Sequence, residues 1–272
     1  NTARMLDVNY QTSLLPQSAA VAQVGWQGML SISELMPAYT AKHGADKGDL
    51  KRAMAHISVK SHANAGKNPK AHLRNPITMD DVMNASMIAE PLGLYDCCGV
   101  SDGSACAIVT TPDIARGLGK KDLVAVKALQ VAVSNGEEVQ FDKWDGSYFA
   151  TTRIAAARAY KEAGITRPRE QVSLVDVHDC FSVTELVTME DLQLSAEGTA
   201  IRDVLDGFFD ADGELPCQID GGLKCFGHPI GASGLRMVYE MYLQLSGRAG
   251  ARQRPAPTWG VTHNLGGFPS QN

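Results

Sequence analysis

Apolar and polar positions follow two different periods along the second half of the chain. The short apolar runs 123–133 and 172–177, "LVAVKALQVAV" and "VSLVDV", have the length and the β-branched content of buried strands. The stretch 151–164 has a helical pattern that ends at Gly164, and a last strand is expected within 257–267. Because strands alternate with helices, this half is predicted to be α/β with a mainly parallel sheet.

The first half of the chain has the pattern of helices joined by polar loops. Ser31 and Glu34 have the spacing of a capping box, which predicts the start of a helix, and Gly44 predicts its end. Thr78 and Asp81 have the same spacing and predict the start of another helix. A mainly helical segment is therefore expected to precede the α/β half.

Further segments complete this pattern. Residues 61–76 are polar and are predicted to form a loop, whereas 97–111 is small and β-branched, which suits a buried strand packed against a helix. Ser182 and Glu185 have cap spacing at the start of a later helix. A last helix carries the apolar residues Leu235, Val238, Met241 and Leu245 and ends at Gly247.

Length and composition are those of a packed, soluble enzyme. The 272 residues suffice for two domains of ordinary size. A hydrophobic content of 44%, with 26 glycines and 12 prolines, excludes collagen-like and disordered classes. The formal net charge of −5 and the lack of a Lys/Arg cluster argue against a nucleic-acid partner, because phosphate binding needs a basic surface.

The cysteines and the N-terminal sequence indicate the cellular compartment in which the protein is expected. The six cysteines have no regular spacing, and a chain of this length does not need disulfides, so reduced thiols in a cytoplasmic protein are expected. No apolar run is long enough for a membrane span, and no secretion signal is visible. The sequence opens with Asn rather than Met, so the true start is expected to lie upstream.

Three segments place reactive side chains where a strand ends or a helix begins. They contain His178 and Cys180, His228 between a glycine and a proline, and His263 to Gly267. Because active crevices of α/β sheets form at the carboxyl ends of strands, the three segments are predicted to converge. Cys180 falls in the first turn of a predicted helix, where free N–H groups and the helix dipole lower the pKa of a thiol.

The glycine-rich loop 221–234 surrounds His228. Such loops cost backbone entropy and persist where a chain bends sharply or a ligand approaches closely. A purely structural histidine is the alternative for His228, and a buried small apolar side chain is the alternative for Cys180. The neighbouring His178 favours a functional thiol at Cys180.

Other chemistries find weaker support. The segment 99–103 matches the G-x-S-x-G pattern of a hydrolase, but that motif needs a strand before it and a helix after it, and the following residues look like a strand. Cys225 and His228 could join His178 and Cys180 in a zinc site, although the spacing is unusual, and no metal is expected. The sequence contains no Walker loop and no G-x-G-x-x-G after a strand, so no motif supports nucleotide hydrolysis or nicotinamide chemistry.

Three ordered motifs carry a family resemblance: "VDVHDCFSVTELVTMEDL", "GGLKCFGHPIGASG" and "VTHNLGG". With them the chain resembles the thiolase superfamily, specifically the branch of sterol-carrier-protein-type, acetyl-CoA acetyltransferase-like thiolases. The earlier stretch 61–109 resembles the same branch, so the likeness runs across most of the chain. Each motif alone is modest, but the ordered set is specific.

The resemblance implies a thiolase fold, an α/β architecture of two βαβαβαββ halves in α-β-α-β-α layers with a helical loop domain that covers the acyl-CoA. It assigns the loop domain and the end of the N-terminal half to residues 1–120, and the C-terminal half to 121–272. The family's acylated cysteine lies upstream of the segment that residue 1 matches, and no cysteine here corresponds to it. The chain is therefore expected to be truncated at both ends, since a half-missing sheet would leave unpaired edges.

The resemblance also implies an activity: making or cleaving the Cα–Cβ bond of a 3-oxoacyl-CoA, with coenzyme A as substrate and no cofactor. Carbon–carbon chemistry next to a thioester needs a base and hydrogen-bond donors for the enolate oxygen. The family pattern gives the acid–base role to Cys180 and implies that His178 helps to form an oxyanion site. It implies that His228 activates the nucleophilic thiolate and also faces the thioester oxygen. Asn264 and Gly266 match a turn that borders the second oxyanion hole.

Two other functions stay open. One is a retro-aldolase of the same fold that acts on a CoA-linked side chain without an acyl-cysteine. The other is a non-catalytic thiolase-like subunit, against which the presence of His178, Cys180 and His228 argues. The resemblance further implies a homodimer or higher oligomer in lipid metabolism that binds acyl-CoA and coenzyme A, with a small OB-fold protein as a candidate partner and no membrane contact.

Overall fold

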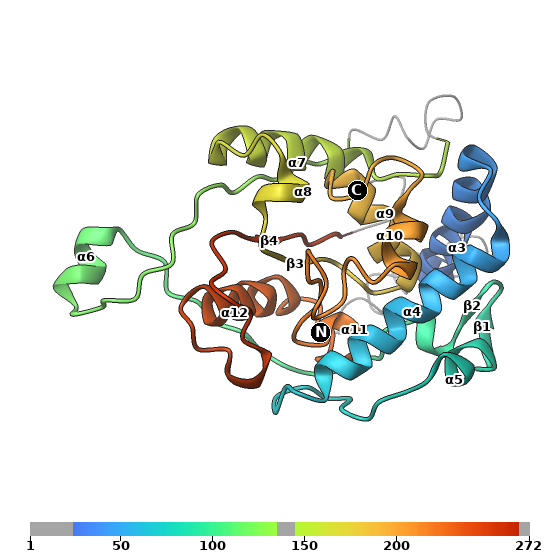
Figure 1. Ribbon diagram of the computed structural model, residues 1–272, viewed down its shortest axis with the longest axis horizontal. Helices are drawn as coiled ribbons and strands as arrows, with labels where there is room; N and C mark the ends of the chain where they lie inside the picture. The colour runs from blue at the N-terminus through green and yellow to red at the C-terminus, as the bar shows by residue number, and fades with distance from the viewer. Residues whose placement is uncertain (1–23, 135–144, 267–272) are drawn as a thin grey trace, which may run out of the picture.

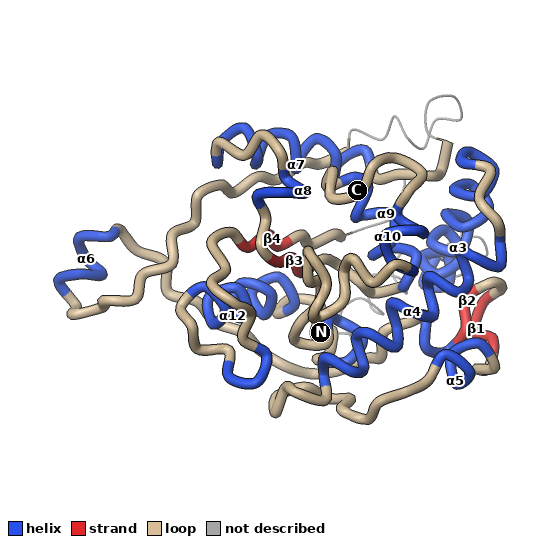
Figure 2. The backbone as a smooth tube through the Cα atoms, in the orientation of Figure 1, coloured by secondary structure: helices blue, strands red, loops and turns tan. Residues whose placement is uncertain are grey.

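The computed structural model describes residues 24–134 and 145–266, with side chains from residue 32 onward. Helices surround a short central pair of strands, β3 and β4, and one small helix, α6, stands apart at one end (Figure 1). The strands are short, and long loops connect many of the helices and strands (Figure 2). Gly267, the last residue of the third motif, lies outside the described residues.

The first two helices are α3 (Val24–His43) and α4 (Lys47–Ala65). Gly44, with a φ of +62°, follows α3 as predicted. The predicted start is wrong, because the helix begins at Val24 and Ser31 lies inside it. The helical apolar pattern continues upstream of Ser31, so the Ser-x-x-Glu spacing at this position does not mark the start of the helix.

The predicted polar loop 61–76 is also partly wrong, since α4 continues through Ala65. Its last turn is polar but buried, because its side chains have tertiary partners. His62 Nδ1–H donates to the Asn75 carbonyl at 2.9 Å, and Asn64 Nδ2 donates to the Gln218 carbonyl at 3.0 Å. Burial of satisfied polar groups therefore stabilises a helix that polarity alone would not predict.

The capping box at Thr78 is confirmed. Helix α5 (Met79–Met83) starts after it, with the Asp81 N–H donating to Thr78 Oγ1 at 3.1 Å and the Thr78 N–H to Asp81 Oδ2 at 2.8 Å. A small antiparallel pair and a 3₁₀ turn follow: β1 (Met87–Ala89), β2 (Leu92–Gly93) and η1 (Leu94–Asp96).

Two predicted strands do not form. Apart from one bridge between Cys97 and Phe181, the segments 97–111 and 123–133 pair with no strand among the described residues. They run as extended chain on either side of α6 (Pro112–Gly117), and their apolar side chains are exposed, including Val100, Ile108, Val109, Leu129, Val131 and Val133. The apolar pattern is present, but a strand also needs a neighbour to accept its hydrogen bonds.

The remaining elements do not alternate strictly between strand and helix, because four α-helices separate β3 from β4. They are α7 (Ala150–Ala163), α8 (Pro168–Gln171), β3 (Leu174–Asp176), α9 (Ser182–Asp191), α10 (Ala200–Leu205), α11 (Gly222–Cys225), α12 (Ser233–Leu245), η3 (Gly250–Arg252) and β4 (Gly260–Thr262). Gly164, with a φ of +74°, ends α7 as predicted.

Strands β3 and β4 pair in parallel, Leu174 with Gly260 and Asp176 with Thr262. The predicted parallel pairing is therefore confirmed for these two strands. Their carboxyl ends lie at the same edge, so the residues that follow each strand are brought together.

Helix α9 differs from its predicted cap. Its N-cap is Phe181, and Ser182 is already helical and makes no cap hydrogen bond. Ser182 Oγ lies 3.0 Å from Ser58 Oγ, and Glu185 forms a buried ion pair with Lys60. Both side chains face α4, because the packing of the two helices provides partners that the capping box does not.

Helix α12 ends before Gly247, as predicted, but its apolar residues Leu235 and Val238 are exposed. The buried face is partly ionic: Arg236 pairs with Asp220, and Glu240 accepts from Arg252 at 2.8 Å, while Gln244 is also buried. Met237 and Met241 are buried on the same face, so apolar packing and ion pairs together define the inward side of this helix.

One hydrophobic core extends from Ile32 to Cys217 and includes α3, α4, β3 and α9. It contains residues from both of the domains expected at 1–120 and 121–272, and that division and the five-layer arrangement stay predictions. In the described part of the chain, no helix combines the length and apolarity that a membrane crossing requires.

Candidate active site

The parallel pair of strands brings the first and third reactive segments into contact. His178 follows β3 by two residues, and Asn264 follows β4 by two residues. The Nδ1–H of His178 donates to Asn264 Oδ1 at 3.1 Å. His178 is buried, whereas Asn264 is exposed, so this contact lies at the edge of the molecule.

The glycine-rich loop brings His228 to the same place. Its ring centroid lies 5.0 Å from that of His178, at an interplanar angle of 86°. His228 Nδ1 lies 2.7 Å from Ser233 Oγ, the first residue of α12. The predicted convergence of the three segments is thus seen in His178, His228 and Asn264.

Glycines at two positions allow the loop to pack closely. Gly227 has a φ of +121°, and a Cβ built on it would lie 2.9 Å from Ser101 Oγ. The His228 N–H donates to this same oxygen at 2.7 Å. A Cβ on Gly103 would lie 2.8 Å from the Pro229 ring. The segment around Ser101 therefore fixes the backbone that carries His228.

Cys180 lies two residues after His178, at the start of α9, and its contacts are different. Its Sγ is 3.9 Å from Thr184 Oγ1, and its carbonyl accepts the Cys98 N–H at 2.8 Å. No hydrogen bond joins Cys180 to either imidazole within residues 24–134 and 145–266.

The prediction of a lowered thiol pKa at Cys180 is wrong. Burial raises the pKa of this thiol far above its usual range, and the neighbouring Cys98 adds to the rise. Hydrogen bonding by Thr184 opposes the effect without reversing it. Cys180 is therefore a neutral thiol at pH 7. The cost of desolvating the thiolate is larger than the stabilisation that the helix N-terminus gives to it.

Both imidazoles are neutral at pH 7. Burial lowers the pKa of His178. Burial, the neighbouring His178 and Arg236 together lower the pKa of His228 to about 4. Each ring therefore carries a single proton, which sits on one of its two nitrogens.

Several residues of the site were missed in the sequence or were noted for another reason. Ser101 was noted only within the G-x-S-x-G match, and Ser233 carried no signal. Asp179 Oδ1 accepts the Leu223 N–H at 2.6 Å, and burial raises the pKa of this carboxyl to about 6. Lys224 is buried beside this group and donates to the Asp96 carbonyl at 2.7 Å. The partners of Asp179 and Lys224 come from distant segments, so no local sequence pattern reveals these contacts.

The backbone role expected of Gly266 in the second oxyanion hole stays a prediction. Gly266 is exposed, and a Cβ built on it would meet nothing within 4 Å. Ser101 lies in an extended segment with no strand before it or helix directly after it, unlike a hydrolase nucleophile. Among the described residues, no group of three or more His, Cys, Asp or Glu side chains is arranged to hold a metal ion.

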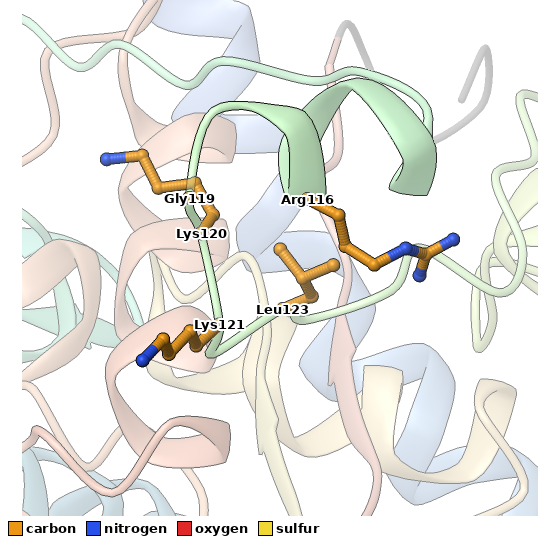
Figure 3. Close-up of a pocket in the computed structure, with 5 residues that line it drawn as sticks. All are labelled: Arg116, Gly119, Lys120, Lys121 and Leu123. Carbon is orange, nitrogen blue, oxygen red and sulfur yellow. The ribbon is translucent and has the colours of Figure 1, made fainter.

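A separate hollow beside α6 is lined by Arg116, Gly119, Lys120, Lys121 and Leu123 (Figure 3). The figure shows the arginine pointing away from the two lysines. The three cations do not converge on one point, and the hollow contains no residue of the histidine site.

Comparison with known proteins gives matches along most of the chain. The family described as thiolase C-terminal domain-like matches residues 134–272. An acetyl-CoA acetyltransferase of Methanothermobacter thermautotrophicus is 36% identical over 93% of this chain and 65% of its own length. A benzoylsuccinyl-CoA thiolase subunit, BbsB of Thauera aromatica, is 31% identical over 84% of this chain and 57% of its own. Human sterol carrier protein 2 is 32% identical over 86% and 43%.

Two solved structures have a similar fold. An Ltp2–ChsH2(DUF35) aldolase superposes with a TM-score of 0.73 at 22% identity, covering 92% of this chain and 64% of the other. A monomeric SCP2-thiolase-like protein type 1 from Mycobacterium smegmatis gives 0.61 at 18% identity, covering 89% and 49%. The chain thus spans less than two thirds of the length of the curated relatives and structures named here.

Proposed function

This chain belongs to the thiolase family, and from that premise we propose that its histidine site makes or cleaves the Cα–Cβ bond of a 3-oxoacyl-CoA. Coenzyme A serves as the acyl acceptor, and no cofactor takes part. The observation that supports this most is the pair of neutral imidazoles: the ring of His178, just after β3, lies 5.0 Å between centroids from the ring of His228 in the loop before α12. The named acetyltransferase and thiolase relatives support the reaction class.

In the cleavage direction, a thiolate attacks the 3-oxo carbon, the Cα–Cβ bond breaks, and the electron pair forms the enolate of the departing acyl-CoA. The enolate oxygen needs an N–H donor, which an imidazole supplies. The enolate carbon needs a proton, and Cys180, two residues after His178 in the chain, is a neutral thiol that can give it. Coenzyme A then takes the acyl group. The attacking thiolate is not assigned to any residue of this chain.

The resting state of Cys180 is the protonation form that the cleavage direction uses. A buried thiol with a raised pKa is a proton donor, whereas the synthetic direction starts from a thiolate. Lipid metabolism, a cytoplasmic location, a homodimer and a small OB-fold partner belong to the same proposal; the aldolase neighbour, named together with ChsH2(DUF35), is compatible with such a partner.

The test is a thiolysis assay of the purified full-length protein with acetoacetyl-CoA and coenzyme A. We expect acetyl-CoA to form, and acyl-enzyme to be trapped by rapid quench and detected by mass. His228→Ala should abolish both signals. The matched control is His72→Ala, which changes an exposed histidine outside the site.

The retro-aldolase alternative gives a different outcome. Release of a ketone or aldehyde from a β-hydroxyacyl-CoA, with no need for free coenzyme A and no acyl-enzyme, would establish an aldolase and refute the thiolase proposal. Absence of both activities, with the native fold retained, would support a non-catalytic subunit.

A further inference from the structure

Lys224 is a buried cation that the proposed mechanism does not use. It lies on α11 and is 4% exposed. Its ammonium group donates to two backbone carbonyls, that of Asp96 at 2.7 Å and that of Tyr95 at 3.3 Å. No carboxylate forms an ion pair with it in the described part of the chain. Burying a charge without an ionic partner is costly, so stability alone does not explain a lysine at this position.

One hydrogen bond attaches the backbone of α11 to the residue before Cys180. Asp179 Oδ1 accepts the N–H of Leu223 at 2.6 Å, and Lys224 is the next residue. Gly222 allows this close approach, because a Cβ there would overlap the Asp179 carboxylate. The start of α9 and the backbone that carries Lys224 are therefore packed against each other.

A second hydrogen bond attaches the segment that Lys224 binds to Cys180 itself. The Cys98 N–H donates to the Cys180 carbonyl at 2.8 Å, and Cys97 and Phe181 form an antiparallel bridge beside it. The two carbonyl groups that accept the ammonium group directly precede this bridge. Three segments of the chain thus form one hydrogen-bonded unit that contains both the thiol and the ammonium group.

The electrostatic effect of Lys224 reaches the thiol. Burial raises the pKa of Cys180, the neighbours Cys98 and Asp179 add to the rise, and Lys224 lowers it. Asp179 is anionic at pH 7, since its pKa is about 6. Two opposite charges therefore act on the thiol from within the same unit.

Other charged groups near the unit are neutralised by partners of their own. Three ion pairs account for them: Asp96 with Lys51, Glu185 with Lys60, and Asp220 with Arg236. The further titratable neighbours are neutral at pH 7, because burial lowers the pKa of the imidazole of His62 and raises the pKa of the thiols of Cys97 and Cys225. Lys224 and Asp179 are thus the unpaired charges beside Cys180 among the described residues.

We propose that Lys224 is a positioning residue for the reaction: its buried ammonium group stabilises the thiolate that Cys180 becomes when it gives its proton to the enolate carbon. Asp179 limits this effect, so the thiol stays protonated until the enolate forms. The role in catalysis rests on the proposed function, whereas the effect of the ammonium group on the thiol does not depend on it.

The proton transfer moves a negative charge into desolvated surroundings. The S–H bond of Cys180 breaks, the proton bonds to the enolate carbon, and sulfur keeps the electron pair, so the charge passes from the enolate to the thiolate. A neighbouring ammonium group stabilises that thiolate relative to the neutral thiol. The thiol proton of the incoming coenzyme A then restores Cys180, and the coenzyme A thiolate attacks the acyl group.

The experiment measures the rate at which iodoacetamide alkylates Cys180 in the purified full-length protein at pH 8.5, by peptide mass spectrometry. This rate follows the thiolate fraction. Lys224→Gln keeps a donor for the carbonyls but removes the charge, so alkylation should slow about tenfold. Lys224→Arg keeps the charge and should retain most of the rate. The control is Lys70→Gln, which removes an exposed cation and should leave the rate unchanged.

An unchanged rate in a folded Lys224→Gln protein, or an equal loss in the glutamine and arginine variants, would overturn the proposal. Circular dichroism and urea unfolding establish that each variant is folded before its rate is compared.

Asp179→Asn tests the same field with the opposite sign, and it decides the question if Lys224→Gln does not fold. The amide oxygen can still accept the Leu223 N–H, whereas the negative charge is lost. Alkylation of Cys180 should therefore become about tenfold faster. Combining this change with Lys224→Gln should bring the rate back toward that of the wild type. A rate in Asp179→Asn that is unchanged or slower would contradict the proposal.

The thiolysis assay supplies an independent measurement. Lys224→Gln should lower kcat about tenfold with little change in KM, because the ammonium group acts on the proton transfer rather than on substrate binding. Lys224→Arg should recover most of the rate, and an unchanged kcat in Lys224→Gln would refute the catalytic role. A wild-type protein without thiolysis would refute the proposed function, while the alkylation rates would still decide whether Lys224 acts on Cys180.

Discussion

At the residue scale, His228 shows how burial sets the charge of a site residue. The ring is half-buried in a loop, and three effects act in one direction: loss of solvent, a neighbouring imidazole and a nearby guanidinium. The result is a pKa of about 4, against an ordinary value of 6.5. A histidine between glycine and proline is visible in the sequence, but its charge state is not.

This pKa predicts a dependence of stability on acid. The folded state keeps His228 neutral while the unfolded state binds a proton below pH 6.5, so stability is lost as the pH falls from 6.5 toward 4. We expect urea unfolding to show a larger loss of unfolding free energy from pH 7 to pH 4.5 in the wild type than in His228→Gln. An equal loss in both proteins would mean that the ring is not neutral in the folded state.

Cys180 provides a second prediction at this scale. Cys180→Ser should preserve folding and coenzyme A binding, because the volume change is small and a hydroxyl can contact Thr184 in place of the thiol. The thiolysis rate should fall roughly 10²-fold, the usual contribution of a positioned acid or base, since an alcohol is a far weaker acid.

The matched control for that experiment is Cys106→Ser, which changes an exposed thiol away from the site. Acyl-enzyme formation should survive in Cys180→Ser if the thiol acts in proton transfer to carbon. Loss of acylation in the folded variant would instead place Cys180 in the first step.

At the element scale, short α11 depends on one glycine. Gly222 opens this helix with a φ of +65°, and a Cβ there would overlap the buried carboxylate of Asp179. Asp179 in turn accepts the Leu223 N–H. The turn, the helix and the carboxylate after β3 are therefore one packed unit that leads into the His228 loop.

Gly222→Ala should therefore destabilise the protein by about 2 kcal/mol or more, since a positive φ costs an alanine roughly 1 kcal/mol and the carboxylate must also move. The measurement is the urea midpoint at constant m-value. Gly231→Ala is the control, because nothing lies within 4 Å of a Cβ there and its φ is not positive. Equal effects of the two substitutions would show that α11 tolerates a side chain at Gly222.

At the scale of the whole molecule, the segments 98–111 and 121–134 stand out because their apolar side chains face solvent. Ile108 is 92% exposed and Val133 is 83% exposed, values usual for charged residues rather than for branched apolar ones. Contiguous apolar surface of this kind marks contact with another molecule or chain segment. The proposed homodimer would provide such a contact.

We therefore predict that sedimentation equilibrium of the full-length protein at micromolar concentration gives about twice the mass of its single subunit. If the two segments form the contact, Ile108→Asp should shift the protein toward the monomer. Ile154→Asp, at an exposed position of α7, should not. A monomer at all concentrations would contradict the dimer.

Some features of this protein follow from the sequence alone, because their causes are local. The capping box at Thr78, the glycine ends at Gly44, Gly164 and Gly247, and the strand that becomes β3 depend on neighbours within a few residues. The family also followed from the sequence, because it is carried by three motifs of fixed order. The meeting of His178 with Asn264 followed from a general property of parallel strands.

The tertiary structure decided the features whose partners are distant in sequence. Polar Asn64 is helical because the Gln218 carbonyl accepts its amide, and α12 buries Arg236 rather than Leu235 because Asp220 pairs with the guanidinium. Apart from the bridge at Cys97, the predicted strands 97–111 and 123–133 do not form, because no described strand pairs with them. Likewise, the raised pKa of Cys180 and the lowered pKa of His228 depend on desolvation and on neighbouring groups that only the fold brings into contact.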